Sequence, residues 1–188
     1  MDSTEPDVRR GFIAEFLAFE AERLGLGIAL IGGEGVNFWV QPRFTQDFDL
    51  TVSANAEAVW ALVDALKAQG YLIAVADDAD SPSGPALVRL KHPEGHPPID
   101  IITAKTDYQN LVIERATPRQ RGVLPVATPE DLIVLKLIAN RSIDHRDIYT
   151  ILETQSIDWE YVEHWARIWD VTDSLQRVRE DWDRRPNR

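Results

Sequence analysis

Apolar residues recur at helical spacing in the first segment of the chain. Between Val8 and Leu24, the side chains of Phe12, Phe16, Phe19 and Leu24 fall at helical spacing, with charged residues between them. Two glycines follow within three residues, as is common after the last turn of a helix. We therefore predict one amphipathic helix over this segment, with the phenylalanines on its apolar side.

A strand, a glycine pair and a second strand come next. The apolar run Ile28–Ile31 indicates a short buried strand that leads directly into Gly32 and Gly33. A short helix is expected over Glu34–Val40, and the alternating run Phe48–Val52 indicates the next strand. Strand and helix thus alternate around a glycine turn.

The following residues complete a sheet. The pattern predicts a helix over Ala54–Gln69 and three more strands, over Tyr71–Val75, Ala86–Leu90 and Ile99–Thr103. With the two earlier strands, they indicate a mixed β-sheet of about five strands flanked by helices. The fold class expected is therefore α+β, with this core spanning residues 1–127.

Residues 128–188 are expected to form a helical C-terminal part packed on the core. Thr128 can cap a helix whose first position is Pro129 and whose first turn carries two acids. Ser142 can cap the next helix, and two more are predicted over Trp159–Trp169 and Val171–Trp182.

Composition narrows the function classes. The chain of 188 residues has no cysteine, so disulfides, thiolate zinc sites and cysteine nucleophiles are excluded. A formal net charge of -11 disfavours a protein that holds a nucleic-acid backbone by its overall field. No apolar run approaches the roughly 20 residues of a membrane-spanning helix. We expect a soluble, cytoplasmic protein that makes no membrane contact.

Two acids on the second strand are candidate metal ligands. Alternation sends Asp47 and Asp49 to one face and Phe48 and Leu50 to the other. Neighbouring carboxylates repel each other unless a cation lies between them, and their oxygens suit Mg²⁺ or Mn²⁺. The alternative is a pair of solvated acids in an exposed loop.

The glycine pair is a candidate phosphate seat. A strand that ends in Gly32 and Gly33 just before a helix brings backbone N–H groups up to an anion without obstruction by Cβ atoms. The alternative is a simple tight turn. Together with acids on the next strand, the turn fits phosphates at the helix terminus and bridging metal on the carboxylates.

Gly32-Gly33 and Asp47-Phe-Asp49-Leu resemble the signature of the DNA polymerase beta-like nucleotidyltransferases. The fuller segment Arg43–Leu50 looks similar to the bacterial stand-alone, AbiEii-like branch found in toxin-antitoxin systems. The resemblance implies that Asp47 and Asp49 bind Mg²⁺ or Mn²⁺, and that Gly32, Gly33 and Thr45 bind the triphosphate of an NTP such as ATP. It also implies a cognate toxin or antitoxin protein as a candidate partner.

Asp100 is the candidate third carboxylate. Such enzymes commonly carry another acid on a neighbouring strand, and Asp100 is the one acid in the apolar run Pro98–Ile102. It could complete the metal site or accept a proton from an attacking hydroxyl. The alternatives are a strand-end acid at an edge and a salt-bridge partner.

Lys136 is the charged residue in the otherwise apolar run Leu132–Ala139. Such a lysine must reach solvent or meet an anion. Asp144 and Asp147 could be its partners, and so could the phosphates of a nucleotide. Lys136 and the two aspartates also resemble the C-terminal pattern of the AbiEii-like branch, which adds Lys136 to the phosphate-binding candidates. A salt-bridged helix pair is the structural alternative.

The sequence therefore predicts transfer of a nucleoside monophosphate from an NTP to an acceptor hydroxyl. The acceptor stays open among tRNA, a protein and a small molecule. A non-catalytic nucleotide-binding or antitoxin-like module is the competing hypothesis. His92 and His96 could also be considered as zinc ligands, but the prolines and glycine around them favour a flexible hairpin loop.

Overall fold

The computed structural model describes residues 4–118 and 120–185. The chain forms two compact units. The first contains the described residues up to Glu34 together with Phe44–Ala127, and the second contains Gly35–Arg43 and the residues from Thr128 onward. No helix in the described part of the chain is both long enough and apolar enough to cross a membrane.

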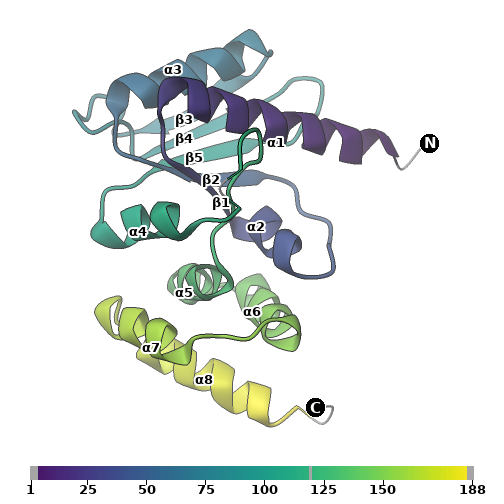
Figure 1. Cartoon of the computed structure of the whole chain (residues 1–188), viewed down its shortest axis with the longest axis vertical. Helices are drawn as coiled ribbons and strands as arrows, with labels where there is room; N and C mark the ends of the chain where they lie inside the picture. The colour runs from purple at the N-terminus through teal and green to yellow at the C-terminus, as the bar shows by residue number, and fades with distance from the viewer. Residues whose placement is uncertain (1–3, 119, 186–188) are drawn as a thin grey trace. The chain divides into compact units, whose positions relative to one another are not determined.

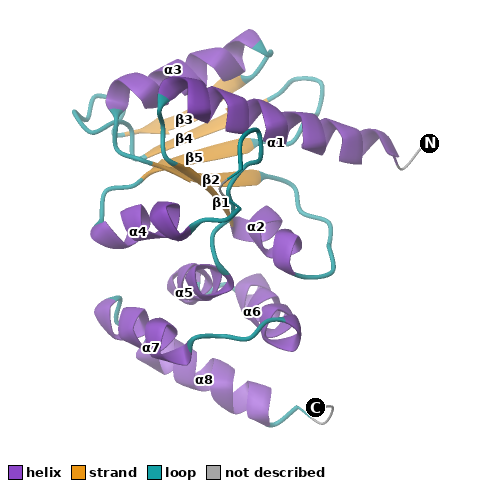
Figure 2. Cartoon of the chain, in the orientation of Figure 1, coloured by secondary structure: helices purple, strands orange, loops and turns teal. Residues whose placement is uncertain are grey.

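The first unit is built on a five-stranded mixed sheet, as expected. The strand order is β1-β2-β5-β4-β3, and β2 and β5 run parallel while the other neighbouring pairs run antiparallel. The strands are β1 (Ile28–Ile31), β2 (Phe48–Val52), β3 (Leu72–Asp77), β4 (Leu87–Lys91) and β5 (Ile99–Thr103). The predicted α+β class is confirmed, and Figure 2 shows all the strands in this one sheet.

One face of the sheet forms the core of the first unit. The side chains of Phe48, Leu50 and Val52 are at most 3% exposed, as period-two alternation requires for one buried face. Helices α1 (Thr4–Leu24) and α3 (Ala56–Ala68) lie on one side of the sheet, and α4 (Asp107–Arg115) lies on the other (Figure 1).

The apolar face predicted for the first helix is wrong. The buried side chains of α1 include Ile13, Leu17 and Ala21, whereas Phe12 and Phe19 are 60% and 56% exposed. These aliphatic residues recur every four positions and so line one side of the helix. Because the helix carries two apolar stripes, periodicity alone could not decide which one packs against the sheet.

Local signals set the ends of several helices. The side chain of Asn55 caps α3 by accepting the N–H of Ala58. Thr106 and Gln109 form a reciprocal capping box that starts α4, a helix that the sequence prediction did not include. The signal, a Thr three residues before a Gln, is present in the sequence.

The second unit is helical, as predicted for the C-terminal part. It holds α5 (Pro129–Ala139), α6 (Ser142–Thr154), α7 (Trp159–Ile168) and α8 (Thr172–Asp183). Thr128 caps α5 by accepting the N–H of Asp131, and Pro129 opens the helix as expected. Helix α2 (Gly32–Trp39) begins in the first unit, and its residues from Gly35 onward belong to the second.

Candidate active site

Strand register brings two of the predicted acids together. Asp49 on β2 lies directly opposite Asp100 on the parallel strand β5. Arg89 on β4 lies opposite Asp100 on its other side. Residues opposite each other on neighbouring strands point to the same face, so Asp49, Asp100 and Arg89 form a row across three strands. Asp47 lies one residue before the start of β2, and its charge acts on Arg89 together with that of Asp49.

Arg89 and Asp100 form a bidentate ion pair. The Nε of Arg89 donates to Oδ1 of Asp100 over 2.8 Å, and its second nitrogen donates to Oδ2. The hydrogen bonds that Arg89 donates to the Asp100 carboxylate, with the charges of Asp100, Asp47 and Asp49, hold the pKa of Arg89 far above its usual range. Of the roles considered for Asp100, the structure shows the salt bridge, and its part in metal binding stays a prediction.

Gly32 lets the Asp49 carboxylate lie against the start of α2. Its φ of +65° falls in the region that favours glycine, and a Cβ there would lie 2.6 Å from the Cγ of Asp49 and overlap its carboxylate oxygen. Gly33 is buried in the same first turn. The first N–H groups of a helix lack partners within it, so this turn presents donors beside Asp49.

Arg10 of α1 holds the segment that leads to the acids. Its guanidinium pairs with Glu34 in the first turn of α2 and donates to the backbone carbonyl of Thr45. It also lies 5.9 Å from the ring centre of Phe48. The pairing offsets the charge of Glu34, which would otherwise repel an anion at this helix terminus. Sequence reasoning missed Arg10 because its partners lie 24 and 35 positions away.

The carboxylate side chains on this face are suitable ligands for a hard divalent cation. Asp47, Asp49 and Asp100 offer only carboxylate oxygens, the ligands that Mg²⁺ prefers. Gly32 leaves space for the Asp49 carboxylate that the Cβ of any other residue would occupy. Among the described residues, however, the carboxylate oxygens of these three acids do not all come within 4.8 Å of one another. The Asp100 carboxylate is turned to Arg89 instead.

Lys136 lies in a buried ion-pair cluster of the second unit. Its Nζ is 3.0 Å from Oδ1 of Asp144 and 2.6 Å from Oδ2 of Asp147, and all three side chains are at most 6% exposed. Arg43 donates two hydrogen bonds to Asp147, over 2.8 and 2.7 Å, and Arg141 donates two to Asp144. The structure thus gives Lys136 the two partners named from the sequence. Phosphate binding by Lys136 stays a prediction.

The cluster keeps both aspartates ionised. Burial raises the pKa of Asp147, but hydrogen bonds from Arg43 and Lys136 outweigh it, and the net pKa is lowered. The pKa of Asp144 is lowered in the same way, against its burial, by Arg141 and Lys136. Two buried anions and three cations therefore join α5, α6 and the end of the 35–43 segment.

The loop from His92 to His96 brings three potential metal ligands together. Ligand atoms of His92, Glu94 and His96 lie within 4.8 Å of one another. The two imidazole rings stack with centroids 3.9 Å apart and an interplanar angle of 6°. Lone pairs of stacked rings lie in parallel planes and do not converge on one ion. Both nitrogens of His92 also have partners, the carbonyl of Gln69 and the N–H of Glu94. This arrangement favours the hairpin interpretation.

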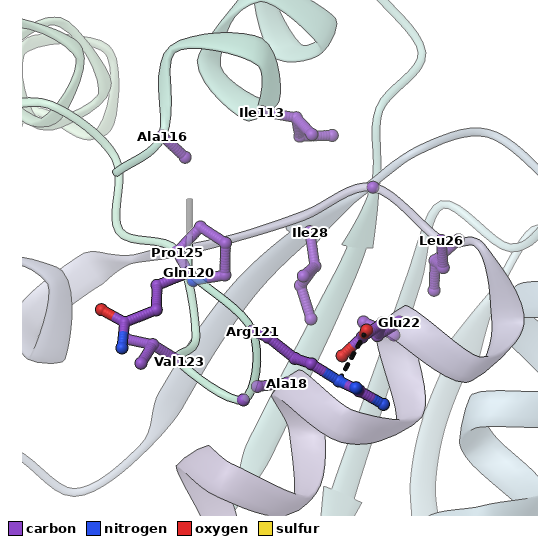
Figure 3. Close-up of a pocket in the computed structure, with 13 residues that line it drawn as sticks. Ala18, Glu22, Leu26, Ile28, Ile113, Ala116, Gln120, Arg121, Val123 and Pro125 are labelled. Atoms are coloured by element: carbon purple, nitrogen blue, oxygen red, sulfur yellow. Dashed lines mark ion pairs between the residues drawn. The ribbon is translucent and has the colours of Figure 1, made fainter. Parts of the chain in front are cut away.

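A separate cavity of about 350 Å³ opens in the first unit (Figure 3). Its walls are mostly apolar, and an ion pair of 3.2 Å joins Glu22 and Arg121 at its side. Ile28, at the start of β1, lines it, whereas Gly32 follows the end of that strand. None of the predicted site residues lines this cavity.

Comparisons with known proteins identify the fold. No protein-family model matches the chain, and no curated protein matches it. The crystal structure of ANT(2")-Ia in complex with adenylyl-2"-tobramycin matches with a TM-score of 0.60 and 14% identity, covering 86% of this chain and 97% of that one. An antigenic nucleotidyltransferase-like protein from Paracoccidioides brasiliensis matches with a TM-score of 0.52 and 15% identity, over 95% and 93% of the two chains.

The lincosamide antibiotic adenylyltransferase LnuA, solved with lincomycin bound, has a TM-score of 0.51 and 20% identity, over 70% of this chain and 89% of that one. Identities this low speak for the fold alone. The chain has the nucleotidyltransferase fold expected from Gly32-Gly33 and Asp47-Phe-Asp49.

Proposed function

We propose that this protein transfers a nucleoside monophosphate from an NTP to a hydroxyl group of an acceptor. The observation that carries the proposal is the row on the sheet, where Asp49 and Asp100 are direct neighbours and the Asp49 carboxylate lies over Gly32 at the start of α2. Carboxylates that can hold a divalent ion thus lie next to backbone N–H groups that can bind phosphate. Phosphoryl transfer requires both of these features.

Each residue of the site has a proposed role in the reaction. Asp47 and Asp49 would hold Mg²⁺ or Mn²⁺, which when bound supplies charge stabilisation for the attacking and leaving oxygens. The N–H groups of Gly32 and Gly33, together with Thr45, would bind the triphosphate. Asp100 would accept the proton of the acceptor hydroxyl at a carboxylate oxygen. The acceptor oxygen forms a bond to the α-phosphorus, and the bond from that phosphorus to the bridging oxygen breaks to release pyrophosphate.

The acceptor we favour is a small hydroxylated molecule. A net charge of -11 disfavours binding of the backbone of a large RNA by the overall field of the chain. ANT(2")-Ia, of which 97% is covered, was solved with an adenylylated aminoglycoside, tobramycin. The AbiEii-like branch, and with it a toxin or antitoxin partner, rests on the two sequence patterns around Asp47 and Lys136.

One observation favours the competing function, a non-catalytic nucleotide-binding module. Asp100, the proton acceptor of the proposed reaction, is bound on both oxygens by Arg89. An enzyme must release this carboxylate in its working state, whereas a binding module need not.

Label transfer separates the two functions. The protein is incubated with each α-labelled NTP and Mg²⁺, together with total RNA, lysate protein or a panel of aminoglycosides and other polyols. We expect label on an acceptor, lost in Asp49→Asn and kept in Asp64→Asn, which changes a surface acid that is 70% exposed. Binding of NTP without transfer to any acceptor would favour the module, and absence of Mg²⁺-dependent NTP binding would refute both functions.

A further inference from the structure

We propose that Arg89 is a built-in counter-cation that occupies Asp100 in the metal-free protein and leaves it when a divalent cation binds. The inference rests on the proposed function, because it concerns the same three acids. It assigns Arg89 a positioning role, in which this side chain regulates the access of metal to the third carboxylate.

The register of the sheet makes the competition direct. Arg89 and Asp100 are opposite residues on antiparallel neighbours, so their side chains leave the same face at the same level. Asp49 stands opposite Asp100 on the other side. The Asp100 carboxylate therefore lies between a guanidinium and a second carboxylate. A divalent ion held by Asp49 and Asp100 would have to compete with Arg89 for the Asp100 carboxylate, both of whose oxygens accept from Arg89.

The charge of the face explains why a cation is needed there at all. Asp49 and Asp100 are cross-strand neighbours, with Asp47 just before the same strand, and neighbouring acids destabilise a sheet when their charge is uncompensated. Arg89 supplies a positive charge to this group. An arginine keeps its charge at every working pH, and this one donates to both carboxylate oxygens of Asp100. Arg89 therefore responds to a competing cation and not to pH.

The exposure of the two partners shows which one moves. The side chain of Arg89 is 42% exposed, whereas that of Asp100 is 6% exposed. The guanidinium can turn into solvent without disturbing the core, because a partly exposed arginine rotates about several bonds. Asp100 is held in the central strands and stays in place. A divalent ion that binds Asp100 thus replaces a movable side chain and requires no opening of the sheet.

Mn²⁺ binding, measured by electron paramagnetic resonance and calorimetry on the full chain, tests the inference. Removal of the competing pair in Arg89→Gln is expected to tighten Mn²⁺ binding by about tenfold, the scale of one charge-assisted hydrogen-bonded pair. Without divalent ions this variant should melt several degrees below the wild type, and Mg²⁺ should restore much of the difference. Lys105→Gln is the control, since it removes one positive charge from an ion pair with Asp78 in the same unit.

The outcomes separate this inference from the proposed function. If wild-type binding is lost in Asp49→Asn but Arg89→Gln binds Mn²⁺ no more tightly than Lys105→Gln, the inference is overturned and the proposed function stands. If neither wild type nor Arg89→Gln binds Mn²⁺, both are overturned.

A measurement on the wild type covers the case in which Arg89→Gln does not fold. Nuclear magnetic resonance of the Arg89 side chain should show an Nε–H that exchanges slowly with water in the absence of metal. We expect Mg²⁺ to speed this exchange severalfold as the guanidinium leaves Asp100. Exchange that is unchanged by saturating Mg²⁺ would overturn the inference.

Discussion

Replacement of Lys136 by methionine should destabilise the second unit by an amount that depends on pH. Methionine has nearly the same length and flexibility as lysine, so Lys136→Met removes the charge with little change in packing. It leaves Asp144 and Asp147 buried near each other, at most 1% exposed, without the ammonium that lies between them.

The magnitude follows from what remains in the cluster. Removal of one partner of a buried ion pair costs about 3–5 kcal/mol, because the other charge is left without compensation. Here Asp147 keeps two hydrogen bonds from Arg43, and Asp144 keeps two from Arg141. The expected loss in unfolding free energy at pH 7 is therefore smaller, about 2–3 kcal/mol.

The pH dependence gives the prediction its sign. The pKa values of Asp144 and Asp147 are lowered in the folded protein, so the stability they contribute is present above the pKa of the unfolded chain. It is lost as the pH falls through the lowered values. The difference between wild type and Lys136→Met should thus be largest near pH 7 and shrink below about pH 4, the usual range of aspartate.

Urea unfolding followed by tryptophan fluorescence is the assay. Five of the six tryptophans lie in the second unit, and only Trp60 lies in the first. Lys67→Met serves as the control, because the ion pair of Lys67 with Asp64 is at least half exposed, and its loss should cost less than about 0.5 kcal/mol. A cost for Lys136→Met below about 1 kcal/mol, or one that stays constant from pH 7 to pH 3, would refute the reasoning.

Two further predictions concern the first unit. Gly32→Ala should abolish Mg²⁺-dependent NTP binding and lower stability by more than the roughly 1–2 kcal/mol of left-handed backbone strain, because its Cβ would overlap Asp49; Gly95→Ala, at φ +75° with no atom within 4 Å of a Cβ, should cost the strain alone and keep NTP binding. Burial raises the pKa of Tyr71 to about 12, so its contribution to stability is present below pH 10 and is lost as the pH rises toward 12. Ultraviolet titration should show a late-titrating tyrosine that is lost in Tyr71→Phe, and a Tyr71 that titrates near pH 10 would contradict the burial argument.

The main elements of the fold could be predicted from local pattern. The strands Ile28–Ile31, Phe48–Val52 and Ile99–Thr103 have the predicted bounds, because their apolar runs are short and bordered by turn residues. Gly32-Gly33 and Asp47-Phe-Asp49 indicated the nucleotidyltransferase fold for the same reason, since glycine conformation and strand alternation depend on neighbouring residues.

Other features depended on segments far apart in the chain. Which stripe of α1 is buried depends on the surface it meets, so the phenylalanine face was predicted wrongly. Arg10 finds its partners more than twenty positions away. Helix α4 is the exception, because its capping box at Thr106 is local and was overlooked.

The three acids illustrate the difference between what local pattern predicts and what depends on contacts between distant segments. The sequence by itself placed Asp49 on a strand whose alternation turns it away from Phe48 and Leu50, because alternation along one strand is a property of the backbone. Only the tertiary structure decided that Asp100 stands beside Asp49 and is bound by Arg89. Strand order and register are set by packing over the whole core, and one residue of slip would turn Arg89 to the opposite face.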